Sequence, residues 1–225
     1  MKFVCQQSDS AVIGLRERAV AYGLGALGDP EVLELFLYRC MPTGARTWAQ
    51  VLLGTWGTLD GVLAADIKDL EAVIGKAPAA DLKVLHEAAL RLAQGQVRRR
   101  DVIASSSALE AYLRIRLSER TREQFRVLFL DRRNHLIADE VLGEGTVDHA
   151  PVYPREIVRR ALQLDACAVI LVHNHPSGQT SPSTSDLKTT QEIVDACGPL
   201  RIVVHDHLLV AGHEVISFKA LGLMK

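Results

Sequence analysis

The sequence predicts an α/β protein of the α+β type, with a helical domain over residues 1–101 and a mixed α/β domain over residues 102–225. Two observations support this division. Apolar side chains recur at helical spacing in the first hundred residues, whereas the remainder alternates helical segments with short β-rich runs. Between the two parts, the composition changes abruptly at Arg98–Arg99–Arg100–Asp101, which marks the expected domain boundary.

The N-terminal domain is expected to form a small helical bundle. Leu82, Leu85, Ala89 and Leu92 recur at the spacing of one helix face. Asp29–Pro30 is typical of a helix start, with the aspartate as N-cap and the proline in the first turn. Several short helices joined by short connections therefore account for this part of the chain.

Charge restricts the class of protein. The chain has 225 residues, and its 26 Lys plus Arg are nearly balanced by 27 Asp plus Glu. Proteins that bind duplex DNA tightly usually carry a basic surplus or a basic face, so strong nucleic-acid binding by the whole chain is not expected. We interpret the arginine run at residues 98–100 as a solvated linker, with a local phosphate-contacting patch as the alternative.

The expected setting is the cytoplasm, without a membrane partner. No apolar stretch approaches the roughly 20 residues that a membrane span requires, and the first seven residues lack the apolar region of a secretory signal. The four cysteines are far apart and form no C-x-x-C pair. This pattern is typical of a reduced intracellular protein.

The C-terminal domain is expected to contain a hairpin, a buried strand and several helices. A capping-box spacing predicts a helix over 107–117, and a proline opens a second helix at Pro154. The turn at 131–135 separates two β-rich runs, which predicts a hairpin. The expected strands are 125–130, 136–141, 168–172, 202–204, 208–210 and 215–218.

The most informative stretch follows the apolar run 168–172. His173 and His175 lie two residues apart after this predicted strand, so both imidazoles can point to the same side. With the carboxylate of Asp186, they could supply three ligands to one zinc ion and leave a fourth position for water, as in catalytic zinc sites. A pair of hydrogen-bonded loop histidines is the alternative, and the same ligand set can also hold non-haem iron.

Asp186 also has a second interpretation. Ser183-x-x-Asp186 ahead of a helix has the spacing of a capping box, which alone would explain both residues. The two roles can coexist, because an ordered helix start would fix the carboxylate near the loop of the histidines.

These residues also carry a resemblance. Glu123 followed by His173-x-His175-Pro176 and Ser183-x-x-Asp186 resembles the JAMM motif of MPN-domain metalloproteases. The surrounding sequence, from about residue 102 to the C-terminus, is similar to the bacterial RadC family. The segments that carry this similarity are Arg122–Asp131, Gly145–Val147, Pro154–Glu156, His173–Gly178, Pro182–Ser183 and Asp206–His207.

The resemblance implies a three-layer α/β domain that binds one zinc ion per chain through His173, His175 and Asp186. It further implies a zinc-dependent hydrolase, most simply a metallopeptidase acting on a peptide or protein substrate. Glu123 would be the general base, and Ser183 would orient water or stabilise an oxyanion. Independently of the resemblance, Glu140 is the alternative base, because it also lies in a predicted strand. A carboxylate within hydrogen-bond reach of an activated water is a suitable proton acceptor.

The N-terminal half resembles the family less closely. RadC-type proteins have a helix-hairpin-helix-like segment there, and Leu70–Ala79 is its counterpart in this chain. This segment keeps Gly75, lacks the second glycine and contains Pro78, so a packing or partner-binding role is expected. The alternative function is a DNA-associated accessory protein for repair or recombination, with a structural or weakly active metal domain.

The remaining histidines are expected to be structural or ordinary surface residues. His205 and His207 are two residues apart in a β-rich run and are expected to share one side of it. A contact with the metal ligands is the alternative for this pair.

Overall fold

The computed structural model describes residues 3–98, 101–102, 106–117, 122–145 and 152–224. The chain divides into two compact units, Met1–Ala88 and Ala89–Lys225. The division falls inside helix α6 (Lys76–Arg98), whereas the composition-based boundary after residue 101 lies just beyond the end of that helix. Two of the three arginines proposed as a linker or phosphate patch, Arg99 and Arg100, lie outside the described residues.

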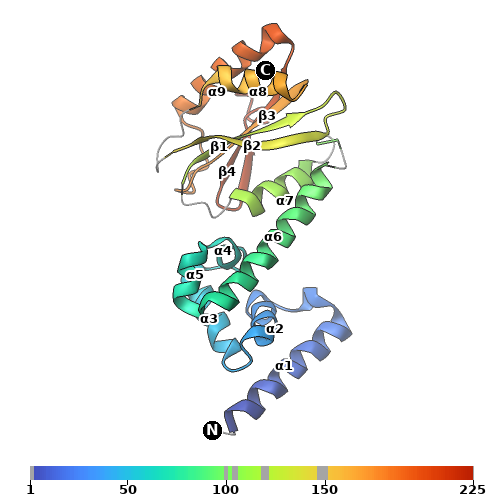
Figure 1. Ribbon diagram of the computed structural model, residues 1–225, viewed down its shortest axis with the longest axis vertical. Coiled ribbons are helices and arrows are strands. Elements are labelled where there is room, and N and C mark those ends of the chain that lie inside the picture. Colours follow the sequence, from blue (N-terminus) through green and yellow to red (C-terminus); the bar gives the residue numbers. More distant parts are fainter. Residues whose placement is uncertain (1–2, 99–100, 103–105, 118–121, 146–151, 225) are drawn as a thin grey trace. The chain divides into compact units, whose positions relative to one another are not determined.

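The first unit is helical. Its core consists of fully buried side chains from several helices, including Leu33, Leu37, Leu52, Leu70 and Leu82. These helices are α1 (Phe3–Tyr22), a 3-10 turn (Leu24–Ala26), α2 (Asp29–Cys40), α3 (Ala45–Trp56), α4 (Leu59–Ala64), α5 (Ile67–Ile74) and the first part of α6 (Figure 1).

The start of α2 differs from the expectation. Gly28 rather than Asp29 is the N-cap, and the Glu31 side chain accepts a hydrogen bond from the Gly28 N–H at 3.1 Å. Asp29 lies in the first turn, where its carboxylate accepts a hydrogen bond from the Leu59 N–H at 3.3 Å. Asp29 therefore links the starts of α2 and α4.

The helix-hairpin-helix-like segment forms the end of α5, a single glycine and the start of α6. Gly75 has φ +84°, a backbone conformation that glycine adopts without strain. Its N–H donates to the Glu71 carbonyl at 3.0 Å and its carbonyl accepts from the Ala79 N–H at 3.2 Å. Because the Gly75 amide already closes α5, this turn does not offer it to a phosphate.

The second unit contains a mixed five-stranded sheet in the order β2-β1-β3-β4-β5. Strands β3 and β4 are parallel, and the other neighbouring pairs are antiparallel. The elements are α7 (Ser106–Leu117), β1 (Gln124–Leu130), β2 (Leu136–Glu144), α8 (Pro154–Gln163), β3 (Ala168–Asn174), α9 (Thr184–Cys197), a 3-10 turn (Gly198–Leu200), β4 (Val203–Ala211) and β5 (Glu214–Ser217).

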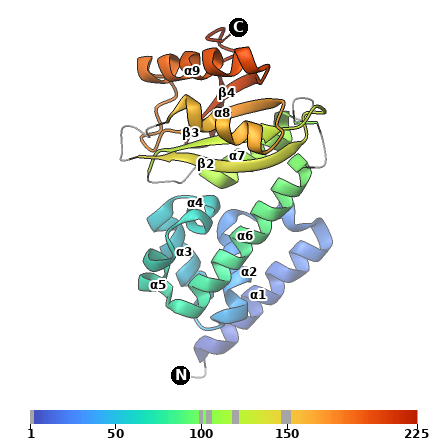
Figure 2. The same ribbon diagram turned by 45° about the horizontal axis from the view of Figure 1, so that its top comes forward.

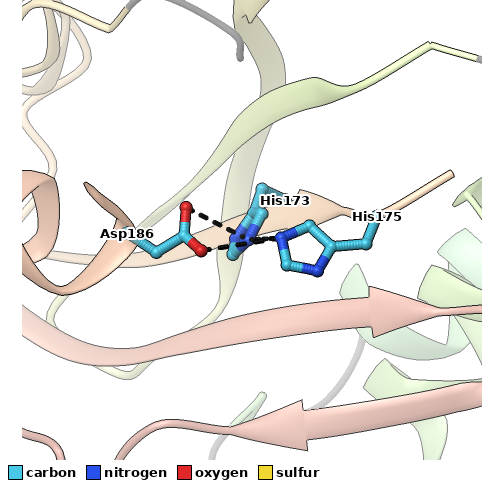
Figure 3. A group of neighbouring side chains, drawn as sticks. All are labelled: His173, His175 and Asp186. Atoms are coloured by element: carbon cyan, nitrogen blue, oxygen red, sulfur yellow. Dashed lines mark hydrogen bonds and ion pairs between the residues drawn. The ribbon is translucent and has the colours of Figure 1, made fainter. Parts of the chain in front are cut away.

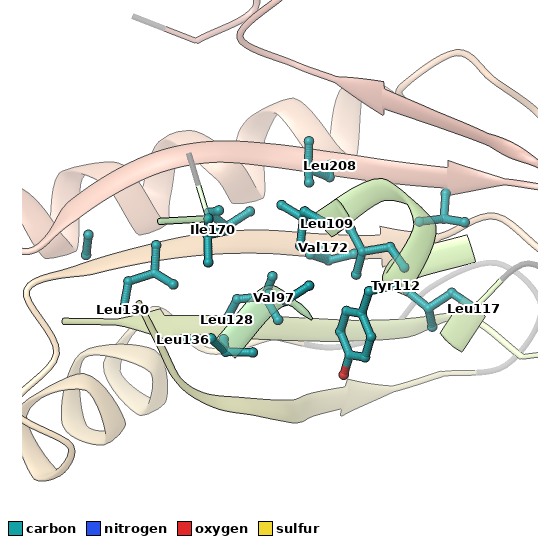
Figure 4. Packing of buried hydrophobic residues seen from close by; sticks show 14 of the residues in the cluster. Val97, Leu109, Tyr112, Leu117, Leu128, Leu130, Leu136, Ile170, Val172 and Leu208 are labelled. Atoms are coloured by element: carbon teal, nitrogen blue, oxygen red, sulfur yellow. The ribbon is translucent and has the colours of Figure 1, made fainter. Parts of the chain in front are cut away.

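Helices cover both faces of this sheet, which confirms the expected three-layer arrangement (Figure 2). On one face, Leu128, Ile170 and Leu208 pack with Leu109 and Leu113 of α7 (Figure 4). On the other face, sheet residues pack with α8 and α9, and this cluster contains Val127, Phe129, Val169, Leu171, Ile157 and Ile193. Strand β3 is buried along its whole length.

The two closing strands expected at 202–204 and 208–210 form one continuous strand, β4. The polar residues between them concealed this continuity in the sequence. The carboxylate of Asp206 accepts hydrogen bonds from the Lys219 N–H and from the Ser217 hydroxyl, so it remains satisfied beside β5. Among the described helices, none combines the length and the apolar character needed to cross a membrane.

A buried ion pair offers a test of this fold. Arg126 and Asp139 pair across β1 and β2 at 2.9 Å, with side chains only 3% and 2% exposed, and the Tyr112 hydroxyl also donates to Asp139. We predict that Asp139→Asn lowers the free energy of unfolding by about 3–5 kcal/mol, because it leaves a buried guanidinium without its counter-charge. Urea denaturation measures this change.

The control is Glu110→Gln, which breaks the exposed Arg114–Glu110 pair of α7. An exposed pair contributes about 1 kcal/mol or less, so this variant should unfold close to the wild type. Equal losses in the two variants would show that burial does not distinguish the pairs.

Candidate metal centre

The first histidine, His173, lies in β3, the central strand of the sheet. His173 pairs with Phe125 of β1 on one side and with Leu209 of β4 on the other, and its side chain is 1% exposed. His175 follows the strand, and its N–H donates to the Val210 carbonyl at 2.9 Å. Backbone hydrogen bonds therefore fix both histidines at the end of the sheet.

Helix α9 carries the aspartate. Ser183 is its N-cap and accepts a hydrogen bond from the Asp186 N–H at 3.2 Å. The Ser183 N–H and hydroxyl each donate to Asp186 Oδ2 at 2.7 Å. The capping box is thus formed in full, and it orients the carboxylate.

The three side chains converge (Figure 3). The Nε2 atoms of His173 and His175 are 3.1 Å apart, and Asp186 oxygens lie 3.6 Å and 3.5 Å from them. Ligand atoms about 2.0–2.1 Å from a tetrahedral zinc lie roughly 3.3 Å from each other, so these separations suit that ion. His175 and Asp186 are 13% and 16% exposed, which leaves the cluster accessible from one side.

The hydrogen bonds around His175 present a bare nitrogen to the cluster. His175 Nδ1 lies 2.8 Å from the Gln179 carbonyl, which can only accept, so Nδ1 carries the ring hydrogen of the neutral form. Nε2 then has a lone pair directed at the other two ligands. A cation at this point would satisfy both imidazoles and the carboxylate, so the donor set fits a metal.

Hydrogen bonds and charges within the cluster shift the pKa values of Asp186 and His175 in opposite directions. Burial alone would raise the pKa of Asp186, but hydrogen bonds with His173, His175 and Ser183 hold that pKa well below its usual range. Hydrogen bonding to Asp186 raises the pKa of His175, and the nearby Glu123 charge adds to this effect. Asp186 is therefore an ionised carboxylate, ready to ligate.

Glu123 lies beside this cluster, immediately before β1, and is 8% exposed. The side chain of Asn174 holds the backbone on both sides of it. Asn174 Oδ1 accepts from the Gln124 N–H at 2.9 Å, and Asn174 Nδ2 donates to the Arg122 carbonyl at 3.1 Å. The Asn174 side chain thereby adds two hydrogen bonds beyond Phe125 and His173, the last backbone pair between β1 and β3.

Glu140, the alternative base, is engaged elsewhere. The Arg160 guanidinium of α8 donates to its two oxygens at 2.7 Å and 2.5 Å. This hydrogen bonding lowers the pKa of Glu140. A carboxylate paired with an arginine accepts a proton poorly, so the contacts favour Glu123.

The expectation that His205 and His207 share one side of a strand is wrong. A register shift in the β3–β4 pairing places His205 as an extra residue between Val204 and Asp206. Val204 therefore packs on the α8–α9 face, whereas Leu208 packs on the α7 face.

The shift separates the two imidazoles. His205 Nε2 meets the Asn134 side chain at 2.9 Å, and His207 Nε2 meets His173 Nδ1 at 2.8 Å. Burial, followed by the neighbouring His173, keeps the pKa of His207 well below its ordinary value. His207 is therefore a neutral partner of His173, a candidate metal ligand.

Sequence reasoning missed two residues of the site. Asn174 stands between the two histidines, and Thr190 faces His207 from α9 with its hydroxyl 2.6 Å from His207 Nδ1. The position of Asn174 between the two histidines was a possible signal, because adjacent side chains of a strand point to opposite faces and a polar side chain there needs a partner of its own. A threonine on the apolar face of a predicted helix was the corresponding signal for Thr190.

Fold and site together define a three-layer α/β domain with a His-His-Asp cluster suited to a metal ion. The family model of the RadC-like JAB domain matches residues 103–223. The chain belongs to the RadC family, with a JAB/MPN-like domain in its C-terminal part. A JAB-like domain with this cluster is consistent with metal-dependent hydrolysis.

Two relatives extend the similarity to nearly the whole chain. A UPF0758 protein of Ruegeria pomeroyi is 47% identical over 213 residues, which cover 93% of this chain and 95% of that protein. A UPF0758 protein of Rhodobacter capsulatus is 48% identical over 213 residues, which cover 93% of this chain and all of that protein. The names of these relatives state no activity.

The cluster predicts a metal-binding defect for His175→Ala. This change removes one of three ligands without opening the buried strand, because His175 lies beyond β3 and is 13% exposed. Elemental analysis of the purified protein should show about one zinc per chain in the wild type and almost none in the variant. His135→Ala, in the β1–β2 turn, is the control, and equal zinc contents in all three proteins would refute the ligand assignment.

The Asn174 clamp predicts a local change in amide exchange. Asn174→Ala removes the acceptor of the Gln124 N–H, so that amide should exchange about 10–100-fold faster, which corresponds to roughly 1.4–2.8 kcal/mol of lost protection. Residue-resolved hydrogen exchange measures it. Asn174→Asp keeps the acceptor and should keep the protection, whereas unchanged exchange in Asn174→Ala would rule out the clamp.

Proposed function

We propose that this protein is a zinc-dependent hydrolase of the JAMM type, which cleaves a peptide or related amide bond in a peptide or protein substrate. One observation carries the proposal. The Nε2 atoms of His173 and His175 lie 3.1 Å apart, with one Asp186 oxygen 3.6 Å from the first and the other oxygen 3.5 Å from the second, at a point that remains partly open to solvent. Membership of the RadC family and its JAB-like domain supports the same class of reaction.

The donor set supports zinc as the metal. Two imidazole nitrogens and one carboxylate oxygen are common zinc ligands, and three protein ligands leave one position for a further group. A zinc ion bound there supplies an acidic water and polarises a substrate carbonyl. The protein itself contributes the ligands, their fixed orientation and the groups that move protons.

Glu123 is the proposed general base. Its carboxylate lies close enough to His175 for its charge to act on that imidazole, and Asn174 fixes the backbone on both sides of it. It would accept the proton of the attacking water and return it to the leaving amine. A carboxylate within hydrogen-bond reach of the attacking water is suited to this role.

Ser183 is the proposed oxyanion donor. Ser183 is an exposed residue at the N-cap of α9, and its hydroxyl donates to Asp186 Oδ2. Rotation about its Cα–Cβ bond would redirect this hydrogen to the negative charge that develops on the substrate carbonyl. The Asp186 carboxylate would retain the Ser183 N–H as a donor.

The experiment that tests the proposal is a cleavage screen of the full chain. Zinc-loaded and chelator-treated protein are incubated with a peptide library and, separately, with single- and double-stranded DNA, and products are identified by mass spectrometry and gel analysis. We expect peptide products that disappear with the chelator and return with zinc. Zinc-loaded protein that cleaves no peptide, or cleavage of DNA alone, would refute a peptidase.

The assignment of the base predicts a separation of activity from metal content. Glu123→Gln should lower kcat by about 10²–10⁴-fold, because the amide cannot accept the proton, and should keep one zinc per chain. Steady-state kinetics on a peptide found in the screen, with elemental analysis, measures both. Glu140→Gln is the matched control and should retain activity, since Arg160 already occupies Glu140; the reverse result would exchange the two roles.

A further inference from the structure

A chain of three short hydrogen bonds runs from a metal-ligand histidine into helix α9. His173 Nδ1 meets His207 Nε2 at 2.8 Å, and His207 Nδ1 meets the Thr190 hydroxyl at 2.6 Å. The same hydroxyl donates to the Asp186 carbonyl at 2.6 Å. These hydrogen bonds therefore join β3, β4 and the first turns of α9.

The carbonyl at the end of this chain determines every hydrogen position along it. A carbonyl oxygen only accepts, so the single hydroxyl hydrogen of Thr190 must be directed at Asp186. His207 Nδ1 must then donate to the Thr190 oxygen, which leaves Nε2 of the neutral His207 ring as an acceptor. His173 Nδ1 consequently carries the hydrogen, and the lone pair of its Nε2 faces His175 and Asp186.

We propose that Thr190 and His207 are positioning residues that fix the tautomer of His173 and thereby commit its Nε2 atom to the metal. The outer partner of a metal-bound histidine commonly fixes its tautomer and ring orientation. In this protein, the partner is itself a histidine, and its own tautomer is set by a threonine on the helix that carries the third ligand.

Burial and aromatic neighbours protect these three hydrogen bonds from competing partners such as water. Thr190, His173 and His207 are 3%, 1% and 1% exposed, so water has little access to any of their hydrogen bonds. The His207 ring packs against Phe218 at 4.3 Å and against Phe125 at 5.4 Å between centroids. Phe125 also stacks on His173, so aromatic side chains hold both imidazoles in their planes.

The arrangement also couples two ligands that lie far apart in the chain. Thr190 binds the backbone of Asp186, whose carboxylate lies 3.6 Å from His173 Nε2. The hydrogen bonds thus form a closed path from one ligand to another through groups that never touch the cation. Loss of the threonine hydroxyl would release both the ring hydrogen of His173 and the turn that carries Asp186.

The variants that test the inference are Thr190→Val, which has the same shape without the hydroxyl, and Thr190→Ser, which restores it. Chelator competition on the full chain should show zinc affinity about 10–100-fold lower in Thr190→Val and near the wild-type value in Thr190→Ser. His205→Ala is the matched control, because it removes an imidazole of the same strand that faces the opposite side of the sheet. It should leave zinc affinity unchanged.

Nitrogen-15 NMR of the histidine rings provides a direct readout in the metal-free wild type. We expect His173 and His207 both to carry hydrogen on Nδ1, and Thr190→Val to lose this uniform state for His207. A hydrogen on Nε2 of wild-type His173, or full zinc affinity in Thr190→Val, would overturn the inference. Since the NMR measurement uses wild-type protein, it decides the matter even where a variant fails to fold.

The inference rests on the zinc-binding part of the proposed function and not on peptide cleavage. Zinc uptake without peptide cleavage would refute the proposed hydrolase while chelator competition still tested the positioning pair. Without zinc uptake, the proposed function would fail. The tautomer of His173 in the metal-free protein would still show whether Thr190 and His207 fix it.

Discussion

Pairing of strand β3 with β1 on one edge and β4 on the other is the constraint on which the rest of the site depends. The strand is buried on both faces, so its register cannot slip by one residue without exchanging every side chain between the two cores. This register turns His173 towards α9 and leaves Asn174 to hold the segment before β1. The position of His173 and the clamp on the segment around Glu123 are therefore consequences of one strand alignment.

Asp186 shows how a helix start can belong to a candidate metal site without a conflict between roles. A carboxylate that caps a helix is already held by backbone and hydroxyl donors, and here these donors come from Ser183. The same oxygens face two imidazoles, and the combined hydrogen bonding keeps the pKa of Asp186 well below its usual range. Capping thus fixes the orientation and the charge of a candidate metal ligand.

Local signals accounted for much of the fold and for the convergence of the three candidate ligands. An apolar run marked β3, the 131–135 turn marked the hairpin, and the Ser183-x-x-Asp186 spacing marked the start of α9. Each of these signals lies within a few residues of the feature it predicts. Such features follow from periodicity and capping chemistry, which a single sequence displays directly.

The parts that sequence reasoning missed depend on partners distant in the chain. Asn174 acts on a segment about fifty residues earlier, and Thr190 meets a histidine seventeen residues later. The continuity of β4 was hidden because the hydrogen-bond donors to the Asp206 carboxylate, Ser217 and Lys219, lie more than ten residues later. No local pattern contains these pairings, since they arise only when the sheet has formed.

The additional residue in β4 decides on which face of the sheet His207 lies. Between the residues paired with Val169 and Ile170, β4 contains one residue more than its neighbour, and this inverts the alternation of side chains beyond it. A regular strand of the same sequence, aligned with β3 through Val204, would instead direct the His207 imidazole towards α7. The centre therefore depends on an irregularity in a strand that supplies none of the three candidate ligands.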